Sequence, residues 1–411
     1  MTAQHITKTT SQSLLIILAA ACCGAALTPA QAQGPQAVKA KTQYQVSNLP
    51  GLGGTSSGGN SIDDQTWVAG YSRLTGDQTR HAALWRSGLL SDLSTLGGPN
   101  SSVTWNVKNT QGVIVGISQT ADPEPLGEFW SSVAFYTGPF AAGFINLGFV
   151  WEQSLNQMRG LPNFPGGNNG FATGANNLRQ AVGWAENDVH DPTCVSPQVL
   201  QFRPAMWTLG PPDQIQDLPL ISGDTSGAAT AINDNGQIVG ISGICDQAIG
   251  RHTAKHAVLW ENGGVTDIYP DAPAPWWNTP TAINQRGDVV GFAGDPAFVE
   301  GDIVHAFMWT KEDGIRQLKP LPHHMPPHVD SEAYGINEAR QVVGISCDAD
   351  FVDCRAVVWN HGNTPTDLND LKGDYSARLE SAKDINNNGE ITGRAIDANG
   401  VRTAYLAVPT P

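Results

Sequence analysis

This chain is short of charge, and of positive charge in particular. Only 15% of its 411 residues are charged, and 23 Lys and Arg stand against 38 Asp and Glu, which gives a formal net charge of −15. Nucleic acids and anionic membrane surfaces are bound through clustered Lys and Arg. The composition therefore argues against both as partners. The acidity selects no partner by itself.

The motifs that mark common catalytic and cofactor sites are also missing. The sequence contains no G-x-S-x-G, no H-E-x-x-H and no glycine loop that opens a helix to hold a phosphate. It has no CxxC pair and no sustained helical period. No cofactor and no metal are expected from motif spacing. What is abundant, 45 Gly and 27 Pro, suits many short strands joined by turns.

Residues 1–32 have the pattern of a secretory signal peptide. Leu14–Leu27 is an apolar run, and Ala30-Gln31-Ala32 follows it as a small-x-small cleavage site. The run is shorter than the ~20 residues that span a bilayer. Cys22 and Cys23 raise a lipoprotein alternative, but neither has Leu, Val or Ile three positions before it. We expect cleavage after Ala32, a secreted or periplasmic protein, and no membrane span in the mature chain.

Four cysteines remain after cleavage. They are Cys194, Cys245, Cys347 and Cys354. An even number in an exported chain favours disulfides over zinc, since no ligand-spaced histidine accompanies them. Cys347 and Cys354 flank a short connection and are expected to pair, as are Cys194 and Cys245 in the corresponding connections of adjacent repeats.

A ten-residue phrase recurs seven times. Its clearest copy runs from Ala231 to Gly240, and the others cover 61–70, 107–116, 174–183, 282–291, 335–344 and 384–393. A period near 50 residues is typical of a repeat architecture. In the fourth unit four short apolar runs lie near 228–233, 237–242, 256–260 and 265–268, and Asn233–Gly236 forms a hairpin turn. The third run ends in a bulky residue, which is in turn Trp85, Tyr136, Trp207, Trp260, Trp309, Trp359 and Leu406.

Four antiparallel strands in each of seven units predict an all-β fold, a seven-bladed β-propeller over residues 33–411 as a single domain. A linear solenoid is the main competitor. The seventh unit contains only three strands, near 381–386, 390–395 and 402–408, while Tyr44–Leu49 matches a missing fourth strand. An N-terminal strand that completes the last blade removes an open sheet edge and closes the ring.

The repeated phrases resemble those of the HAF-repeat family of probable extracellular bacterial proteins. The resemblance rests on the Ile-Asn-x-x-Gly-x-Val-Val-Gly core, on His305-Ala306-Phe307 with its variants at His81 and His256, and on the Asp-Leu-x-x-Leu-Gly-Gly segment. Ser132, Arg203 and Arg402 stand where the pattern has His. The resemblance implies export and a repeat fold. It implies no reaction and no catalytic residue.

Repeated polar residues favour structural roles. Asp384–Gly389 matches the start of a calcium loop, but Ala395 stands where the twelfth-position carboxylate is needed. We expect a plain hairpin turn there. His81, His256 and His305 occupy equivalent places in a ring and cannot converge on one metal, so we expect hydrogen bonds between neighbouring blades. The repeated Trp is expected in the core, with its N–H on a backbone acceptor.

Two segments break the repeat and supply the candidate ligand-binding residues. The loop 271–277 is expected to expose Trp276 and Trp277, which suit stacking on sugar rings. The loop 320–330 brings together His323, His324, His328 and Asp330, a set that suits a transition metal or acid–base chemistry. Packing of both loops over the rim of the propeller is the competing interpretation.

The connections indicate which face is functional. The long segments 119–131, 185–202, 242–255, 269–280, 293–304 and 319–333 join strands 2→3 or 4→1 and emerge on one face. Because binding residues concentrate on variable loops held by a rigid scaffold, we expect an exported non-enzymatic protein that binds an extracellular carbohydrate or protein there. The alternative is a hydrolase or lyase that acts on a polymer such as a polysaccharide.

The exported protein should begin at Gln33, because the only small-x-small site that closes the apolar run ends at Ala32. Intact-mass measurement of the exported protein checks this. A mass that includes a lipid on Cys22 or Cys23 would instead indicate a membrane-anchored lipoprotein.

Overall fold

The structure is a computed structural model that describes residues 42–410 apart from 129–131, 133, 134, 137, 246–253, 273–276 and 296–302. Thr42–Pro411 form one compact unit. The predicted signal peptide and Trp276 lie outside the described residues.

The described residues form 28 strands and one short 3-10 helix. The strands of the first two blades are β2 (Gly53–Ile62), β3 (Val68–Leu74), β4 (Arg80–Arg86), β5 (Leu89–Asp92), β6 (Gly97–Ser102), β7 (Val113–Pro123), β8 (Phe144–Glu152) and β9 (Gln157–Gly160). Those of the third and fourth are β10 (Gly166–Ala175), β11 (Gln180–His190), β12 (Leu200–Thr208), β13 (Gln214–Asp217), β14 (Ser226–Ile232), β15 (Ile238–Gly243), β16 (His256–Glu261) and β17 (Gly264–Asp267).

The second half of the chain repeats the scheme. The fifth and sixth blades contain β18 (Trp277–Ile283), β19 (Val289–Asp295), β20 (Ile303–Thr310), β21 (Gly314–Leu318), β22 (His328–Ile336), β23 (Gln341–Asp348), β24 (Cys354–Asn360) and β25 (Thr366–Asp367). The helix η1 (Leu368–Asp370) follows, and the seventh blade contains β26 (Arg378–Ile385), β27 (Ile391–Ile396), β28 (Arg402–Thr410) and the N-terminal strand β1 (Gln43–Asn48).

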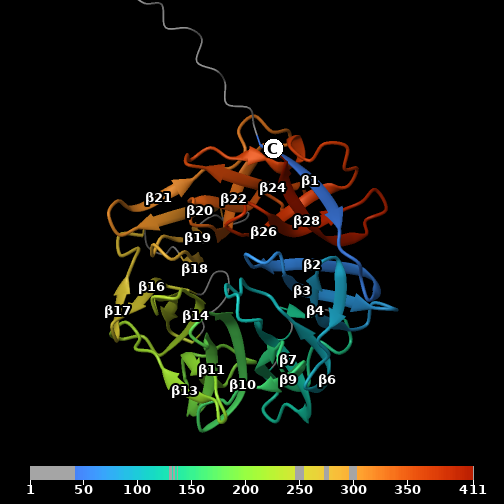
Figure 1. The fold of residues 1–411 in the computed structure, drawn as a ribbon. Helices are drawn as coiled ribbons and strands as arrows, with labels where there is room; N and C mark the ends of the chain where they lie inside the picture. The colour runs from blue at the N-terminus through green and yellow to red at the C-terminus, as the bar shows by residue number, and fades with distance from the viewer. Residues whose placement is uncertain are drawn as a thin grey trace, which may run out of the picture. The chain divides into compact units, whose positions relative to one another are not determined.

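These strands build the predicted seven-bladed propeller. Five blades are separate four-stranded antiparallel sheets, and the first and seventh blades are joined into one eight-stranded sheet by a single parallel bridge between Ser56 and Arg402. Figure 1 shows the blades following one another around a centre. Residues from all seven blades line one cavity at that centre, as a ring requires and a linear solenoid does not.

The ring closes as the sequence predicts. Strand β1 pairs antiparallel with β28, with Tyr44 opposite Pro409 and Asn48 opposite Tyr405; Figure 1 shows β1 beside β28. Trp85 of the first blade donates its Nε1–H to the carbonyl of Pro50, 2.8 Å away, just after β1. The first and seventh blades are therefore held together by backbone pairing and by a core side chain.

The repeated tryptophan has the predicted role in four units, of which the first contains Trp85; Trp309 of the fifth is only partly buried. Trp207, Trp260 and Trp359 are buried, and each donates its Nε1–H to a backbone carbonyl in the connection that leaves the preceding blade, at 2.6–3.0 Å. The indole ring fills the space between two blades, and its N–H keeps a hydrogen-bond acceptor. Each unit is thereby coupled to the one before it.

The prediction for the repeated histidine was wrong in one respect. His81 Nδ1 lies 2.9 Å from Asp92 Oδ1, and His256 Nδ1 lies 2.7 Å from Asp267 Oδ2. Both partners lie within the same blade, because the third and fourth strands pair and bring the start of one opposite the end of the other. Arg203 substitutes for His by binding Asp217 in the same way.

The glycine that ends each ten-residue phrase permits a close approach between two strands. A Cβ at Gly240 would collide with the carbonyl oxygen of Ala228, and the other six closing glycines meet the first strand of their own blade in the same way. In the fourth blade the pairing of β14 with β15 shifts register between Ala229 and Ala231. The bulge brings the backbones too near for any side chain.

The second unit was misaligned in the sequence. Its third strand is β8, which contains the buried Trp151 near its end, and not the segment that ends at Tyr136. Tyr136 lies instead in the connection between β7 and β8. The 20-residue connection between β7 and β8 moves the third strand away from the expected spacing, and it hid the correct Phe149-Val150-Trp151 match.

Both predicted disulfides are present. Cys194 is bonded to Cys245 and Cys347 to Cys354, with Cα–Cα distances of 4.6 and 4.2 Å. Disulfides form and persist in oxidising compartments, and they place the protein in one. Among the described residues, no helix is long and apolar enough to cross a membrane.

Deletion of residues 33–50 should lower the thermal midpoint by roughly 5 °C or more, because it removes the backbone partner of β28 and the acceptor of Trp85. Thermal unfolding followed by circular dichroism measures this. Deletion of 33–41 alone is the matched control and should leave the midpoint unchanged. An equal midpoint for the two deletions would mean that β1 contributes nothing to closure.

Candidate functional site

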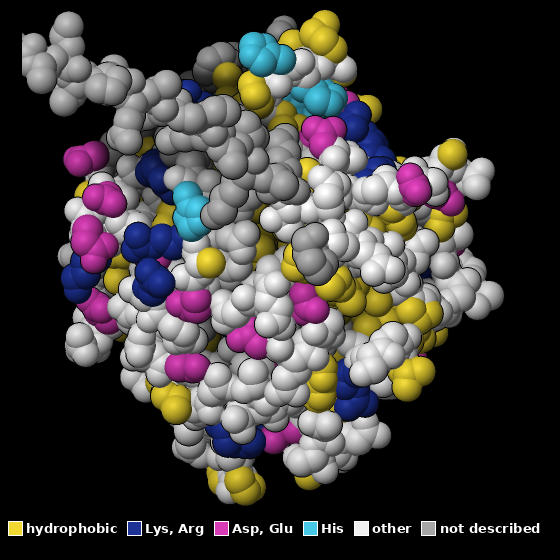
Figure 2. Space-filling view, turned by 45° about the horizontal axis from the view of Figure 1, so that its top comes forward, with side chains coloured by type: hydrophobic (Ala, Val, Ile, Leu, Met, Phe, Trp, Pro, Cys, Tyr) yellow, Lys and Arg dark blue, Asp and Glu magenta, His cyan; other side chains and the backbone are white. Residues whose placement is uncertain are grey.

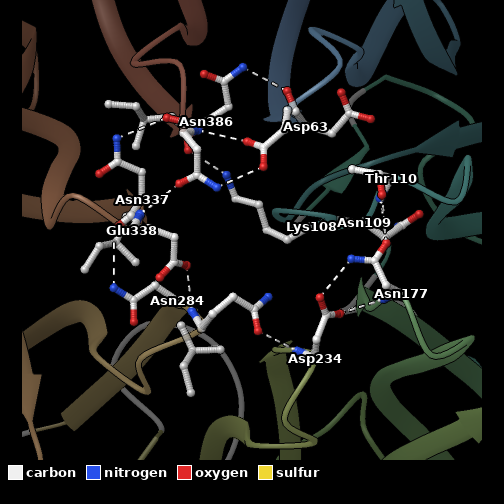
Figure 3. A pocket seen from close by; sticks show the side chains of 16 residues that line it. Asp63, Lys108, Asn109, Thr110, Asn177, Asp234, Asn284, Asn337, Glu338 and Asn386 are labelled. Atoms are coloured by element: carbon white, nitrogen blue, oxygen red, sulfur yellow. Dashed lines mark hydrogen bonds between the residues drawn. The ribbon is translucent and has the colours of Figure 1, made fainter.

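The central cavity opens on the face that carries the 1→2 turns. It measures about 160 Å³ and is lined by turn residues of every blade, among them Asp63, Lys108, Asn177, Asp234 and Asn337. Figure 3 shows these side chains arranged around the cavity and bonded to one another. The question is whether their polar atoms are available to a ligand.

An inner ring of hydrogen bonds uses the asparagine that starts the 1→2 turn in the third to seventh blades. Its Nδ2–H donates to the backbone carbonyl of the equivalent residue in the next blade, at 2.9–3.3 Å, in the series Asn176, Asn233, Asn284, Asn337, Asn386 and Asp63. Its Oδ1 accepts two N–H groups of its own turn, as Asn233 does from Asn235 and Gln237. One side chain therefore both shapes the hairpin and joins two blades.

An outer ring uses the next residue along the chain. Here a side-chain oxygen accepts the backbone N–H of the equivalent residue in the preceding blade, at 2.7–3.0 Å, in the series Thr110, Asn177, Asp234, Gln285, Glu338, Asn387 and Asp64. Asp, Asn, Gln and Glu all serve, because each reaches the N–H with an oxygen. The acidic groups at this mouth are therefore engaged in joining the blades.

Two residues that depart from the repeat meet below these rings. Lys108 stands where five other units have Ile, and Asp384 stands where two units have Ala. The Lys108 Nζ lies 2.7 Å from Asp384 Oδ1 and 2.6 Å from the carbonyl of Ile385, so the side chain reaches across the cavity; Figure 3 shows this reach. The Asp384 side chain is fully buried, and burial raises its pKa.

The pair explains the calcium-like segment. Asp384 is bonded to Lys108 and to the N–H groups of Ile62 and Ile385, and Asn386 shapes the turn as its counterparts do. These oxygens are therefore committed to protein donors, and the segment is the hairpin turn that the sequence predicts. The polar side chains described here on the 1→2 face are therefore engaged in bonds within the protein.

The opposite face holds the long connections, and it contains the residues predicted as ligand-binding. Trp277 was expected to be exposed, but it is buried. It begins β18, is 2% exposed, and packs edge-on against Phe292 with ring centroids 5.7 Å apart. The strand begins within the expected loop and directs this ring inward. Trp276 lies outside the described residues.

The predicted histidine loop is divided between a loop and a strand. His323 is exposed and His324 is partly exposed, whereas His328 and Asp330 are buried residues of β22. The Asp330 carboxylate accepts the backbone N–H of Val304 at 2.6 Å, so it belongs to the blade. The structure does not bring the four residues together as one site.

Two of them meet a residue that the sequence prediction missed. The rings of His324 and His328 stack with centroids 4.1 Å apart, and both face Asp353 from the connection between β23 and β24. Burial, followed by the charge of His324, lowers the pKa of His328 to about 4. Nothing in the spacing of Asp353, 25 residues after His328, links it to the histidines in the sequence.

An arginine–tyrosine cluster also went unpredicted. We define it as Tyr71, Arg80, Tyr136, Glu380 and Arg394. The Arg80 guanidinium lies 4.5 Å from the ring centroid of Tyr71 and 5.2 Å from that of Tyr136. Arg394 Nε donates to Glu380 at 2.8 Å. The cluster joins the seventh blade, the first blade and the long connection of the second.

The cluster carries excess positive charge. Glu380 is shared between Arg394 and Arg402, at 2.8 and 3.1 Å, while none of the described residues forms an ion pair with Arg80. Burial would raise the pKa of Tyr71, but the charges of Arg394 and Arg80 hold it below its ordinary value. In contrast, the surface drawn in Figure 2 shows Lys and Arg in small separate groups among acidic side chains.

Alignment of the seven repeats points to one member of this cluster, Arg394. The residue after the closing glycine is Tyr71, Ile117, Trp184, Ile241, Phe292, Ile345 and Arg394 in the seven units. Arg394 is the one charged member. Lys383 is likewise the one charged residue at its repeat position; its Nζ lies 3.4 Å from the centroid of the Tyr334 ring, and burial lowers its pKa to about 8. The seventh blade thus concentrates charged departures.

Two further carboxylates are perturbed but inaccessible. Glu128 and Glu186 are 3% and 1% exposed. Glu128 accepts the N–H groups of Val199 and Leu200, and Glu186 accepts the N–H of Asn169. Burial raises the pKa of Glu186 to about 8. Because both side chains are buried, a polymer cannot reach them in this conformation.

Replacement of Lys108 by Ile should lower the free energy of unfolding by roughly 3 kcal/mol, because it leaves the buried Asp384 carboxylate without its cation. Asp384→Ala should cost less, since the Lys108 side chain is 25% exposed and keeps carbonyl acceptors. The double variant restores apolar residues of the repeat and should recover most of the loss in chemical denaturation. A double variant as unstable as Lys108→Ile would contradict this account.

Comparisons with family models and with curated proteins give no match. Among solved structures, a structural genomics protein of unknown function from Bacteroides thetaiotaomicron is 8% identical, with 90% of this chain and 99% of that chain covered and a TM-score of 0.31. A glucose dehydrogenase is 11% identical over 89% and 100%, with a TM-score of 0.35. The arabinanase of Bacillus subtilis is 13% identical over 56% and 89%, with a TM-score of 0.26. At these values the matches carry no argument about function, and the propeller rests on its own strand pairing.

Proposed function

We propose that this protein is an exported, non-enzymatic binding protein that takes an anionic extracellular ligand at the arginine–tyrosine cluster, on the face of the 2→3 and 4→1 connections. The ligand class that fits is an oligosaccharide with carboxylate or sulfate groups. The observation that carries the proposal is Arg80, a guanidinium held between two tyrosine rings without a carboxylate partner among the described residues.

The chemistry of Arg80 supports an anionic ligand. Its Nε is buried and has no hydrogen-bond partner among the described residues, and burial lowers its pKa. An unpaired buried charge is costly. A carboxylate or sulfate group would supply the missing acceptor, and planar guanidinium groups bind such oxygens bidentately.

The scaffold supports a binding role. The polar side chains of the 1→2 face are engaged in two rings of inter-blade bonds, while on the other face Cys194–Cys245 lies in the 2→3 connections and Cys347–Cys354 lies at the strand ends that flank one. Cys194–Cys245 ties the 2→3 connections of the third and fourth blades together, and Cys347–Cys354 ties the sixth. Binding loops anchored in this way lose little conformational entropy when a ligand arrives.

Export and family membership belong to the same proposal. Residues 1–32 are proposed to be a cleaved signal peptide, which agrees with the oxidising compartment that the disulfides indicate. The repeated Asn-x-x-Gly turns and the His–Asp pairs support placement among the HAF-repeat proteins.

The test is calorimetric titration of the mature protein, without a polyhistidine tag, with three probes of similar length. These are an oligogalacturonate, a sulfated oligosaccharide and a neutral oligosaccharide. We expect saturable binding of one of the two acidic probes and none of the neutral one. The probe that binds identifies the anionic group.

Arg80→Met should weaken that binding at least tenfold, since the variant keeps the packing of the side chain and removes its charge. Arg86→Met is the matched control. Arg86 ends the same strand at the opposite face and lies 5.0 and 6.0 Å from the ring centroids of Trp67 and Trp151. Binding that is absent for all three probes, or that is equal in the two variants, would rule out the proposed site.

One observation favours a lyase as the second candidate. A tyrosine whose pKa is lowered by two arginines suits a base that removes a proton beside a carboxylate, with an arginine neutralising that carboxylate. Tyr71 would be the base and Arg80 the neutralising group. The same oligogalacturonate incubation, followed by ultraviolet absorbance of an unsaturated product, separates the two: product release indicates a lyase, and stable binding without product indicates a binding protein.

A further inference from the structure

A compact group of nitrogen and oxygen ligands lies on the sixth blade, apart from the arginine–tyrosine cluster. His324 belongs to the connection between β21 and β22, His328 begins β22, and Asp353 ends the connection between β23 and β24. One ring nitrogen of His324, one of His328 and a carboxylate oxygen of Asp353 all lie within 4.8 Å of one another. Three elements of one blade therefore direct one potential ligand each toward a common point.

The distances suit a small ion better than direct bonds. Asp353 Oδ2 lies 3.7 Å from His324 Nδ1 and 3.9 Å from His328 Nε2, which is too long for hydrogen bonds. Two ligands on a tetrahedral zinc ion lie about 3.4 Å apart, given bonds of about 2.0–2.2 Å. Small side-chain movements would bring all three atoms to that separation.

His328 supplies the independent sign of a ligand. Its side chain is fully buried, and its Nε2 has no hydrogen-bond partner among the described residues. Its Nδ1 lies 2.9 Å from Ser346 Oγ. A proton on Nδ1, donated to Ser346, leaves a lone pair on Nε2 that is directed at Asp353. This arrangement, in which the second nitrogen of the ring is fixed by a hydrogen bond, is usual for metal-bound histidine.

Asp353 is held with one oxygen turned to the histidines. Its Oδ1 accepts hydrogen bonds from Arg355 and Arg378, its Oδ2 accepts only a longer one of 3.4 Å from Arg355 Nη2, and its backbone N–H donates to Asp348. The Cys347–Cys354 disulfide closes the connection directly beside it. Oδ2 is therefore presented to the histidines by a constrained loop.

We propose that His324, His328 and Asp353 form a binding site for one divalent transition-metal ion, of which Zn²⁺ is the reference case. Two imidazoles and one carboxylate suit zinc, and also iron, nickel and copper. The His324 and Asp353 side chains are 21% and 18% exposed, so an ion can enter from solvent and keep a position open for water. The site does not depend on the function proposed for the arginine–tyrosine cluster.

The test uses the mature full-length protein without a polyhistidine tag, stripped with EDTA and dialysed. Titration with Zn²⁺ should show one saturable ion per chain and a rise in the thermal midpoint, since an ion that binds only the folded state stabilises it. Co²⁺ in place of Zn²⁺ should give the visible absorption of a low-coordinate nitrogen- and oxygen-bound ion.

His324→Ala should weaken Zn²⁺ binding at least tenfold and remove the Co²⁺ absorption. His323→Ala is the matched control, because His323 is exposed in the same loop and is not part of the group. Asp353→Asn is a second test of the site, through a ligand that is not a histidine. The proposal is overturned by the absence of saturable binding, by equal effects of the two histidine variants, or by a Co²⁺ spectrum that matches the hydrated ion.

Discussion

The fold depends on one amide side chain repeated around the ring. In the third to seventh blades the asparagine that opens the 1→2 turn shapes its own hairpin with Oδ1 and bonds the next blade with Nδ2, as Asn233 does toward Asn284. A net stability of about 0.5–1.5 kcal/mol for each hydrogen bond is modest. Five of the seven junctions carry this bond, however, and the ring makes each blade depend on its neighbours. Asp63 in the first blade accepts in the same way but cannot donate. In the second blade Asn109 Nδ2 donates to Val113 within its own turn, so the series is interrupted at these two blades.

This constraint divides the molecule into two unlike faces. The 1→2 turns must keep their length and their polar residues, because both rings of hydrogen bonds run through them. The 2→3 and 4→1 connections carry no such requirement and are free to lengthen, as the 20 residues between β7 and β8 show. The disulfides, the group of His324, His328 and Asp353, and the arginine–tyrosine cluster all belong to these connections or to the strands next to them.

Charged departures from the repeat fall into two groups. Lys108 and Asp384 replace apolar residues and pair with each other across the cavity, so their role is structural. Arg394 and Lys383 also replace uncharged residues. Arg394 is paired with Glu380 and lies beside Tyr71, and Lys383 lies over the Tyr334 ring. A buried charge is retained only where a partner or a ligand balances it.

The propeller, its closure by Tyr44–Leu49 and both disulfides could be predicted from the sequence, because repeat spacing and strand period are local properties that survive variation between units. The prediction failed at the second blade, where a long insertion displaced Trp151, and at Trp277, whose strand starts earlier than the turn residues suggested. Only the tertiary structure decided which residues meet. Asp353 approaches His324 and His328, and Arg394 approaches Tyr71, because blades and paired strands bring distant segments together, and no spacing along the chain encodes those distances.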